Sequence, residues 1–375
     1  MVAETSNNIL TKRVIYDTCI QQSFKLFVGS WNVGGIPPPH NFNLDKFLHT
    51  QDSMADIYVL GFQEIVPLNA GNILAAEHSN ISIKWNSLIK AALNKRTPTE
   101  DAFHKTETGE SQRVYPLTTQ SSIKPGATDY KCIISKQMVG IYITIWARTE
   151  ISQYISYPSV SCVGCGILGR LGNKGSVSIR FFLHETSFCF VCSHLASGGK
   201  EGDERHRNAD AANILSHTLF PPEPLQHLPR KILDHDRVIW LGDLNYRIQL
   251  PEKTTRSLVK NKEWNLLLQS DQLCKNEIKL RAEMSKGHVF EEWNEGLIEF
   301  APTYKYEQNS DDYYGSCHKG KVKRMRAPAW CDRIIWFGKG LKQIQYNRVE
   351  SRLSDHRPVY GRFIAYVEVS TLPGI

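Results

Sequence analysis

Short, almost continuous apolar runs, rich in β-branched and aromatic residues, recur along this chain of 375 residues and limit what it can fold into. Runs of this kind that end in glycine or in polar residues predict buried β-strands. The predicted strands are residues 24–31, 57–62, 138–147, 160–167, 176–183, 187–193, 237–241, 334–337 and 359–369. The four from 138 to 193 follow one another through short turns, which implies antiparallel pairing.

Apolar residues at helical spacing separate several of these runs. The spacing predicts helices at residues 43–51, 72–93, 203–219 and 253–284. Strands and helices in alternation are typical of an α/β fold. Residues 94–136 are rich in Thr, Ser, Lys and Glu and poor in apolar residues, so we predict a surface insertion there.

The composition excludes several classes of protein. With 41% apolar and 22% charged residues, the chain is not collagen-like, coiled-coil or wholly disordered. Its longest near-apolar runs fall well short of the roughly 20 residues that a membrane span requires. The first residues lack the order of a secretory signal, and no lipidation signal is visible. Nine scattered cysteines favour free thiols in a reducing compartment. We therefore predict an intracellular, cytoplasmic protein, with peripheral contact to membranes as an open alternative.

Four of the cysteines, Cys162, Cys165, Cys189 and Cys192, have a spacing that resembles a zinc site. The second pair belongs to a predicted strand, in which residues three apart point to opposite faces of the sheet. The two sulfur atoms of that pair could not easily reach one ion. We favour small buried cysteines in strands and keep zinc as the alternative.

Five polar clusters follow or precede the predicted strands. They are Trp31-Asn32, Gln63-Glu64, Ser193-His194, Asp243-Leu244-Asn245 and Ser354-Asp355-His356. Each cluster alone could simply form a turn. Together they supply carboxylates for a hard cation, amides to orient ligands, and histidines to donate to a phosphoryl oxygen. That inventory indicates metal-assisted hydrolysis.

Two phosphate-binding loops are excluded by the sequence. The glycine-rich stretch 169–175 has Asn173 before Lys174 and Gly175 after it, so it lacks the Ser or Thr that a Walker loop requires. No helix-opening GxGxxG follows the first predicted strand, which excludes the dinucleotide fingerprint.

Positive charge is concentrated near the C-terminus. The last 75 residues contain 13 Lys and Arg against 7 Asp and Glu, and so carry most of the net charge of +7. A charge run of this kind could be a solvated surface or a patch for nucleic acid or membrane. Here it leads directly into the segment 327–333, where it could hold a second phosphate of the same substrate.

These residues resemble the inositol polyphosphate 5-phosphatases, and the likeness extends from about Trp31 to Phe363. It rests on the motifs at 31–35 (WNVGG), 60–68 (LGFQEIVPL), 172–175 (GNKG), 193–198 (SHLASG), 240–248 (WLGDLNYRI), 302–306 (PTYKY), 326–334 (RAPAWCDRI) and 354–359 (SDHRPV). The Gly-Gly at 34–35 and the Val-Gly-Cys-Gly at 163–166 look most like the plant branch.

The resemblance implies a fold and a set of roles. The fold would be the DNase I-like four-layer sandwich, two packed, mostly antiparallel β-sheets flanked by helices. Mg²⁺ would be the cofactor. The implied metal ligands are Glu64, Asn32 and Asp355. The implied catalytic residues are Asp243 as the base, Asn245 positioning the attacking water, His356 oriented by Asp332, and His194 and Asn32 beside them.

The same resemblance gives the basic run a function. Tyr304, Lys305, Arg324 and Arg326 would hold the phosphate adjacent to the one removed. The family often has Lys where this chain has Arg324, and that difference could alter which neighbouring phosphates are accepted.

The leading hypothesis is Mg²⁺-dependent hydrolysis of the 5-phosphate of inositol polyphosphates or phosphoinositides by direct in-line attack of water. The alternatives are a nuclease-type phosphodiesterase of the same superfamily and a catalytically silent phosphoinositide-binding module. Inositol polyphosphates or phosphoinositide head groups would be the partners, no nucleic acid is expected, and the oligomeric state is left open. Because the motifs run from residue 32 to 356, we predict one catalytic domain at 23–367, an N-terminal extension at 1–22 and a C-terminal tail at 368–375.

Overall fold

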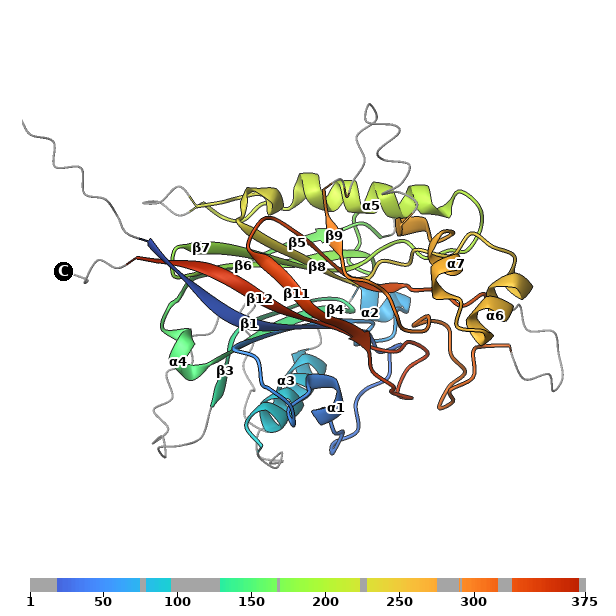
Figure 1. The fold of residues 1–375 in the computed structure, drawn as a ribbon, viewed down its shortest axis with the longest axis horizontal. Helices are drawn as coiled ribbons and strands as arrows, with labels where there is room; N and C mark the ends of the chain where they lie inside the picture. The colour runs from blue at the N-terminus through green and yellow to red at the C-terminus, as the bar shows by residue number, and fades with distance from the viewer. Residues whose placement is uncertain are drawn as a thin grey trace, which may run out of the picture.

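Two six-stranded β-sheets pack face to face in the computed structural model, with helices on their outer sides (Figure 1). The residues that the structure describes are 19–74, 79–95, 129–166, 169–222, 228–274, 290, 292–315 and 326–370. The two packed sheets and their flanking helices match the predicted fold class.

The first sheet has the strand order β11-β12-β1-β2-β4-β3. Its strands are β1 (Cys19–Asn32), β2 (Ile57–Gln63), β3 (Tyr130–Met138), β4 (Ile141–Arg148), β11 (Leu341–Arg348) and β12 (Val359–Ser370). Strands β1 and β2 are parallel, and the other neighbours are antiparallel. The first and last long strands of the chain, β1 and β12, therefore lie side by side.

The second sheet has the order β5-β6-β7-β8-β10-β9. Its strands are β5 (Ile155–Gly164), β6 (Gly175–Leu183), β7 (Thr186–His194), β8 (Arg237–Asp243), β9 (Asn294–Glu295) and β10 (Asp332–Phe337). Again one pair, β7 and β8, is parallel, and the remaining pairs are antiparallel. Each sheet thus contains a single parallel pair near its centre.

Helices cover both outer faces (Figure 1). Helix α5 (Asp203–His217) lies over the second sheet, and α1 (Asp45–Leu48) and α3 (Ser79–Leu93) lie under the first. The remaining helical segments are α2 (Ala70–Leu74), α4 (Thr149–Ser152), the 3-10 turn Ile232–Asp234, α6 (Glu252–Lys260) and α7 (Trp264–Leu268). Among the described residues, no helix combines the length and apolar character that a membrane crossing requires.

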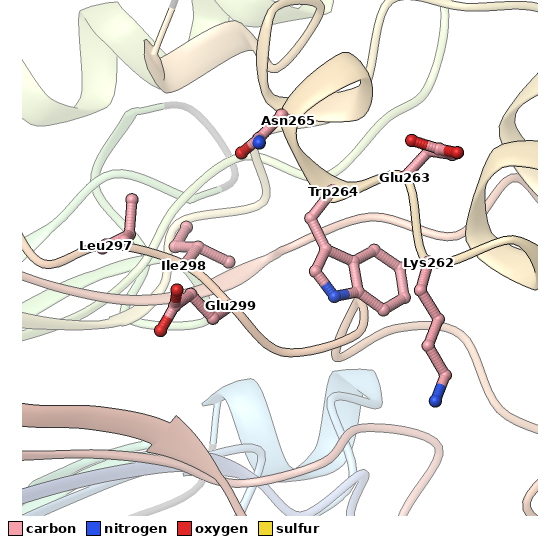
Figure 2. A pocket seen from close by; sticks show the side chains of 7 residues that line it. All are labelled: Lys262, Glu263, Trp264, Asn265, Leu297, Ile298 and Glu299. Carbon is pink, nitrogen blue, oxygen red and sulfur yellow. The ribbon is translucent and has the colours of Figure 1, made fainter.

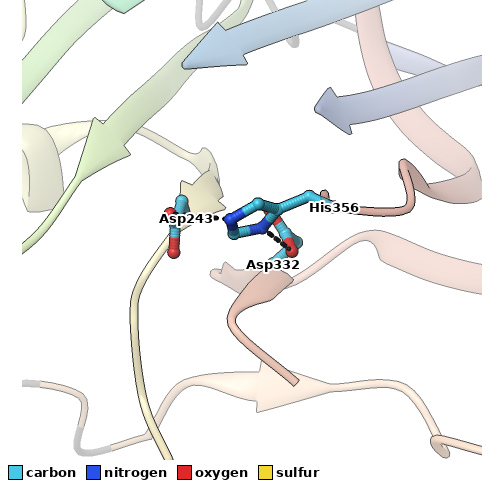
Figure 3. A group of neighbouring side chains, drawn as sticks. All are labelled: Asp243, Asp332 and His356. Atoms are coloured by element: carbon cyan, nitrogen blue, oxygen red, sulfur yellow. Dashed lines mark hydrogen bonds and ion pairs between the residues drawn. The ribbon is translucent and has the colours of Figure 1, made fainter. Parts of the chain in front are cut away.

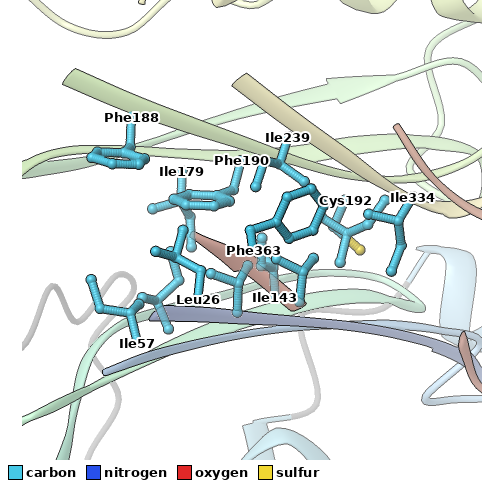
Figure 4. Close-up of a cluster of buried hydrophobic side chains, with 14 of the residues drawn as sticks. Leu26, Ile57, Ile143, Ile179, Phe188, Phe190, Cys192, Ile239, Ile334 and Phe363 are labelled. Carbon is cyan, nitrogen blue, oxygen red and sulfur yellow. The ribbon is translucent and has the colours of Figure 1, made fainter. Parts of the chain in front are cut away.

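Three apolar clusters fill the spaces between these layers. Val28 and Phe190 belong to the cluster between the sheets (Figure 4), Trp85 of α3 packs on the outer face of the first sheet, and Ile214 of α5 packs on the second. Successive strand residues point to opposite faces, so a strand covered on both sides needs apolar residues at every position. This explains why the strands are nearly continuous apolar runs.

Most of the predicted strands are confirmed, but the polar edge strands were missed. Strand β11 alternates exposed and partly buried residues, so no apolar run marks it. Strand β3 lies within residues 130–138, so the prediction of a surface loop up to residue 136 is wrong there. Residues 96–128 of that insertion lie outside the described part of the chain, as do residues 1–18 of the predicted N-terminal extension.

All four predicted helices are shorter or broken. The segment 72–93 contains α2 and α3 as separate helices, and 43–51 forms only the short α1. The segment 253–284 is interrupted after α6, where Lys262 has a left-handed φ of 58°, and residues 275–284 lie outside the description. Helix α5 ends at His217, before the predicted end at residue 219, and Leu219 is half exposed.

The cysteine pattern behaves as strand geometry predicts. Cys189 packs in the cluster under α5, whereas Cys192 packs between the two sheets. Cys162 is exposed on β5. Because the second pair faces opposite sides of β7, these four thiols do not surround one ion.

The close approach of the two sheets predicts the effect of one substitution. A Cβ atom on Gly61 of β2 would lie 2.8 Å from both Cys192 Sγ and Leu241 Cδ1 of the facing sheet. Gly61→Ala should therefore lower the free energy of unfolding by about 1–3 kcal/mol, because the packed sheets must separate. Gly71→Ala in α2, where the nearest atom is 3.4 Å away, is the matched control. Urea unfolding checks this, and equal midpoints for the two variants would contradict it.

Candidate active site

Polar residues stand at strand ends in both sheets, and the pairing register brings them to one edge. In the second sheet His194 ends β7, Asp243 ends β8 and Asp332 begins β10, and these three are register partners. In the first sheet Asn32 and Gln63 end β1 and β2 and are paired. Parallel strands end at the same edge of a sheet, where an antiparallel neighbour begins. The topology therefore delivers side chains distant in sequence to one place.

Asp243 links the ends of the two sheets. Asn32 Nδ2 donates to Asp243 Oδ2 at 2.9 Å and lies 3.3 Å from Glu64 Oε1. His194 Nε2 lies 3.2 Å from Asp243 Oδ2 and 3.8 Å from Glu64 Oε1. Lys174 Nζ contacts the same imidazole nitrogen. Two carboxylates from different sheets thus meet at one amide and one imidazole.

The surroundings of Asp243 keep it ionised. Burial alone would raise the pKa of this carboxyl, but His194, His356 and the Lys174 ammonium together lower the pKa below its ordinary value. Burial, with Lys174 second, lowers the pKa of His194. At neutral pH the site therefore contains a negative Asp243 beside a neutral His194.

His356 and Asp332 form a second pair beside Asp243 (Figure 3). His356 Nδ1 lies 2.9 Å from Asp332 Oδ2, which also accepts a hydrogen bond of 2.6 Å from Thr303 Oγ1. The other ring nitrogen lies 4.0 Å from Asp243 Oδ2. Burial lowers the pKa of His356, but Asp332 outweighs it with the help of Asp243, and the pKa is raised to about 9. The imidazole is therefore positively charged at neutral pH.

Two of these residues have an unusual backbone conformation. Glu64 and Asn245 have φ of 53° and 57°, in the left-handed region that residues with a Cβ rarely adopt. Asn245 is held there because its backbone N–H donates to Asp243 Oδ1 and its Nδ2 donates to Leu195 O, both at 3.1 Å. Such strained residues concentrate at functional sites.

Three candidate residues form a more exposed rim. The side chains of Glu64, Lys305 and Asp355 are 29%, 27% and 29% exposed, whereas those of His194, Asp243, Asp332 and His356 are at most 6% exposed. Lys305 Nζ donates to Asp355 Oδ2 at 2.7 Å. The partly buried Tyr304 ring lies 4.5 Å from the His356 ring. A ligand would therefore reach the buried aspartates from the side of this rim.

The structure describes one of the two arginines that are predicted to hold the neighbouring phosphate. Arg326 is exposed, and a Cβ on Gly199 would lie 3.7 Å from its Nη1, so its guanidinium lies beside the loop that follows β7. Its backbone carbonyl accepts a hydrogen bond of 2.9 Å from Arg256 of α6. Arg324 lies outside the described residues.

The donor set fits a hard divalent cation. Glu64 and Asp243 offer carboxylate oxygens around Asn32, and Glu64 is exposed enough to leave room for water, as Mg²⁺ requires. Asp243, Asp332 and His356 also have ligand atoms within 4.8 Å of one another. That group fits a metal less well, because Nδ1 of the protonated His356 faces Asp332.

A separate cavity of about 400 Å³ lies between α7 and the segment that follows β9 (Figure 2). It is lined by Lys262, Glu263, Trp264, Asn265, Leu297, Ile298 and Glu299. None of the candidate site residues that the structure describes lines it. We therefore assign the chemistry to the strand-end cluster and not to this cavity.

Sequence reasoning missed three residues that the structure places in the site. Lys174 lies in the glycine-rich stretch that fails as a Walker loop, yet its ammonium reaches His194. Thr303 and Arg247 lie inside the motifs around Tyr304 and Asn245, where no role was assigned to them. Arg247 donates to Asn245, and Thr303 donates to Asp332. Their position within these motifs was the signal that could have identified them.

Residues 29–362 match the family "Endonuclease/Exonuclease/phosphatase family 2". The chain is 55% identical to type IV inositol polyphosphate 5-phosphatase 9 of Arabidopsis thaliana, over 93% of this chain and 79% of that protein. It is 48% identical to type I inositol polyphosphate 5-phosphatase 8 of the same plant, over 92% and 71%.

Solved structures show the same fold. The inositol polyphosphate 5-phosphatase domain of SPsynaptojanin, in complex with inositol (1,4)-bisphosphate and calcium ion, is 29% identical and has a TM-score of 0.73 over 94% of this chain and 87% of that one. A Cimex nitrophorin in its ferrous NO complex, 18% identical, has a TM-score of 0.60 over 92% of this chain and 99% of that one. The nitrophorin shares the fold alone, since its identity is too low to indicate a function.

The pair formed by His356 and Asp332 predicts a titration. In metal-free protein, an NMR titration of the histidine ring protons should place the pKa of His356 at about 9. The stability that its charged form contributes should be complete below a pH of about 6.5 and be lost as the pH rises through 9. Asp332→Asn should lower this pKa, because the carboxylate that outweighs the effect of burial is then absent.

The control is Asp52→Asn, which removes the exposed partner of His49. That substitution should leave the titration of His356 unchanged. An Asp332→Asn protein whose His356 still titrates near 9 would contradict the pairing.

Proposed function

The chain belongs to the endonuclease/exonuclease/phosphatase family and, within it, to the inositol polyphosphate 5-phosphatases, and we propose that it removes the 5-phosphate of inositol polyphosphates or phosphoinositides by Mg²⁺-dependent, direct attack of water. It is thus a hydrolase. The observation that carries the proposed mechanism is the buried, ionised Asp243, bonded to Asn32 of one sheet and His194 of the other.

Asp243 would act as the base toward the attacking water. An ionised carboxylate at neutral pH can accept the proton of a water that it positions. The Asn245 backbone N–H donates to Oδ1 of this carboxylate, so Asn245 is held directly beside the proposed base. The proposed attack needs no covalent intermediate, because water is delivered directly to phosphorus.

The two histidines would contact the scissile phosphate. His356 carries a positive charge and is held through Nδ1 by Asp332, so its other nitrogen is available to donate to a phosphoryl oxygen. His194 lies on the other side of Asp243. Donors fixed before the substrate arrives stabilise charge that develops in the transition state.

Glu64, Asn32 and Asp355 would hold Mg²⁺. Glu64 and Asp355 are partly exposed carboxylates, and Asn32 lies between Glu64 and Asp243. When bound, the ion would neutralise charge on the phosphoryl oxygens during the displacement. Lys305 donates to Asp355, and Asn32 donates to Glu64.

Tyr304, Lys305, Arg324 and Arg326 would bind the phosphate next to the one removed. Tyr304 and Lys305 are adjacent to His356 and Asp355 in space, so a neighbouring phosphate at the rim would meet them. An arginine guanidinium can donate two parallel hydrogen bonds to phosphate oxygens, and a lysine ammonium attracts them as a point charge. A soluble head group and a membrane lipid share this chemistry, so both are candidate substrates.

A related nuclease would share the metal site, which makes phosphodiester cleavage the second candidate function. The proposed role of Tyr304 and Lys305 disfavours it, because DNA has no second phosphate monoester next to the phosphodiester that a nuclease cleaves. Faster cleavage of plain or abasic DNA than of inositol phosphates would establish this alternative in place of the 5-phosphatase.

The proposed base predicts the outcome of one substitution. Asp243→Asn should lower phosphate release from inositol 1,4,5-trisphosphate about 10²–10⁴-fold, since an amide accepts no proton from water. Calorimetric binding of the substrate should be retained. The control Asp52→Asn changes an exposed carboxylate paired with His49 and should turn over normally.

Failure of wild-type protein to release phosphate from the soluble substrate and from the matching lipid, with Mg²⁺ present, would overturn the proposed function. Circular dichroism would show whether an inactive Asp243→Asn protein is folded, and so whether the substitution removed the chemistry or the fold. Full activity of a folded Asp243→Asn would remove Asp243 from its role as base.

The proposed metal ligand predicts a second result. Glu64→Gln should raise the Mg²⁺ concentration that half-maximal phosphate release requires by at least about tenfold, because cation affinity follows the number of charged ligands. Glu150→Gln, an exposed carboxylate on α4 that pairs with Arg148, is the control. Direct Mg²⁺ binding by calorimetry gives a readout that does not depend on activity. Unchanged binding by Glu64→Gln would contradict the assignment.

A further inference from the structure

Arg247 contacts a residue of each half of the proposed site. Its Nε donates to the Asn245 carbonyl at 3.0 Å, and its Nη2 donates to Asn245 Oδ1. Its guanidinium also lies 4.6 Å from the centre of the Tyr304 ring. Asn245 is a proposed catalytic residue, and Tyr304 is proposed to bind the neighbouring phosphate. Arg247 is therefore a physical link between them.

The backbone of Arg247 is anchored independently of these contacts. Its N–H donates to Gln272 Oε1, and its carbonyl accepts from the Gln272 N–H, both at 2.9 Å. Gln272 Oε1 also accepts from Arg207 Nη2, and Arg207 is fully buried. Since the backbone is fixed, the orientation of the guanidinium depends on its contacts with Asn245 and Tyr304.

The Asn245 side chain depends in turn on Arg247. Its Nδ2 donates to Leu195 O, and its Oδ1 accepts from Arg247, so these two bonds fix the plane of the amide. The residue is already in the left-handed region, with φ of 57°. Loss of the arginine bond would leave the amide free to rotate about its remaining bond.

Tyr304 lies where a ligand at the rim would reach it. One neighbour of its ring is Arg247, at 4.6 Å, and another is the His356 ring, at 4.5 Å. Lys305 Nζ is 5.5 Å from the same ring. A phosphate that contacts Tyr304 and Lys305 would restrict the ring, and through it the stacked guanidinium.

We propose that Arg247 is a positioning residue that ties the orientation of Asn245 to Tyr304, so that a phosphate bound next to the scissile one raises the turnover rate as well as the affinity. This inference rests on the proposed 5-phosphatase function. It concerns specificity: substrates with the neighbouring phosphate are favoured at the chemical step. The link uses the planar guanidinium of arginine, because its Nε and Nη2 bond two oxygens of Asn245 while the group lies against the Tyr304 ring, an arrangement that the compact ammonium of lysine does not reproduce.

A double-substitution cycle tests the link, with Arg247→Lys, Tyr304→Leu, which removes the ring, and the double variant. The substrates are inositol 1,4,5-trisphosphate and inositol 1,5-bisphosphate, which lacks the phosphate at position 4. On the trisphosphate each single substitution should lower kcat about tenfold, and the double variant should fall little further, because both changes break one connection. On the bisphosphate the wild-type kcat should already be low, and Tyr304→Leu should change it much less.

The matched control is Arg348→Lys. Arg348 likewise lies against a tyrosine ring, with its guanidinium 5.6 Å from the centre of the Tyr306 ring, and it donates to the hydroxyl of that residue. Its other bonds go to the carbonyls of Ala301 and Pro302 and to Glu350. This substitution should alter the melting temperature more than the ratio of kcat between the two substrates. A similar fall in that ratio in Arg348→Lys would mean that the effect comes from general loosening of residues 301–306 and not from a link through Arg247.

The outcomes separate the inference from the function beneath it. If wild-type protein releases phosphate from neither of these substrates nor from the matching lipid, the proposed function fails. If it is active but the factors of the two single substitutions multiply in the double variant, or appear only in KM, the link through Arg247 is wrong. Should Arg247→Lys fail to fold, Tyr304→Leu alone still decides: its kcat on the trisphosphate must fall toward that on the bisphosphate.

Discussion

A buried carboxylate with partners from two sheets is the constraint on which the site depends. Asp243 is almost fully removed from water, where an unpaired charge would be very unfavourable. Its stabilisation requires Asn32 from the first sheet and His194 from the second, with His356 close by. The two sheets must therefore meet with their strand ends aligned. The apolar cluster between them fixes that alignment.

The topology meets this requirement with one parallel pair in each sheet. In both cases the pair brings two polar strand ends to the same edge, Asn32 and Gln63 in one sheet, His194 and Asp243 in the other. The antiparallel β10 adds Asp332 at that edge. Left-handed turns at Glu64 and Asn245 then direct side chains into the site. The chemistry is thus concentrated where the regular pairing stops.

Sequence patterns could predict the buried strands and the polar clusters at their ends, because strands covered on both faces leave near-continuous apolar runs. Edge strands such as β11 were missed, since half of their surface is in water and the run is broken. The links between clusters were also beyond sequence reasoning. Nothing in the spacing of Lys174 and His194, or of Thr303 and Asp332, indicates contact, because only pairing across strands and loops brings them together. The family resemblance supplied roles for single residues, whereas the structure supplies their neighbours.

The central claim is that water, activated beside Asp243, attacks phosphorus directly. The stereochemical course at phosphorus tests it: a substrate whose 5-phosphorothioate is made chiral with oxygen isotopes is hydrolysed in isotopically labelled water, and the configuration of the released thiophosphate is measured. A single in-line displacement predicts inversion of configuration. Retention would mean that two displacements had occurred through a covalent phosphoenzyme, and would contradict the account.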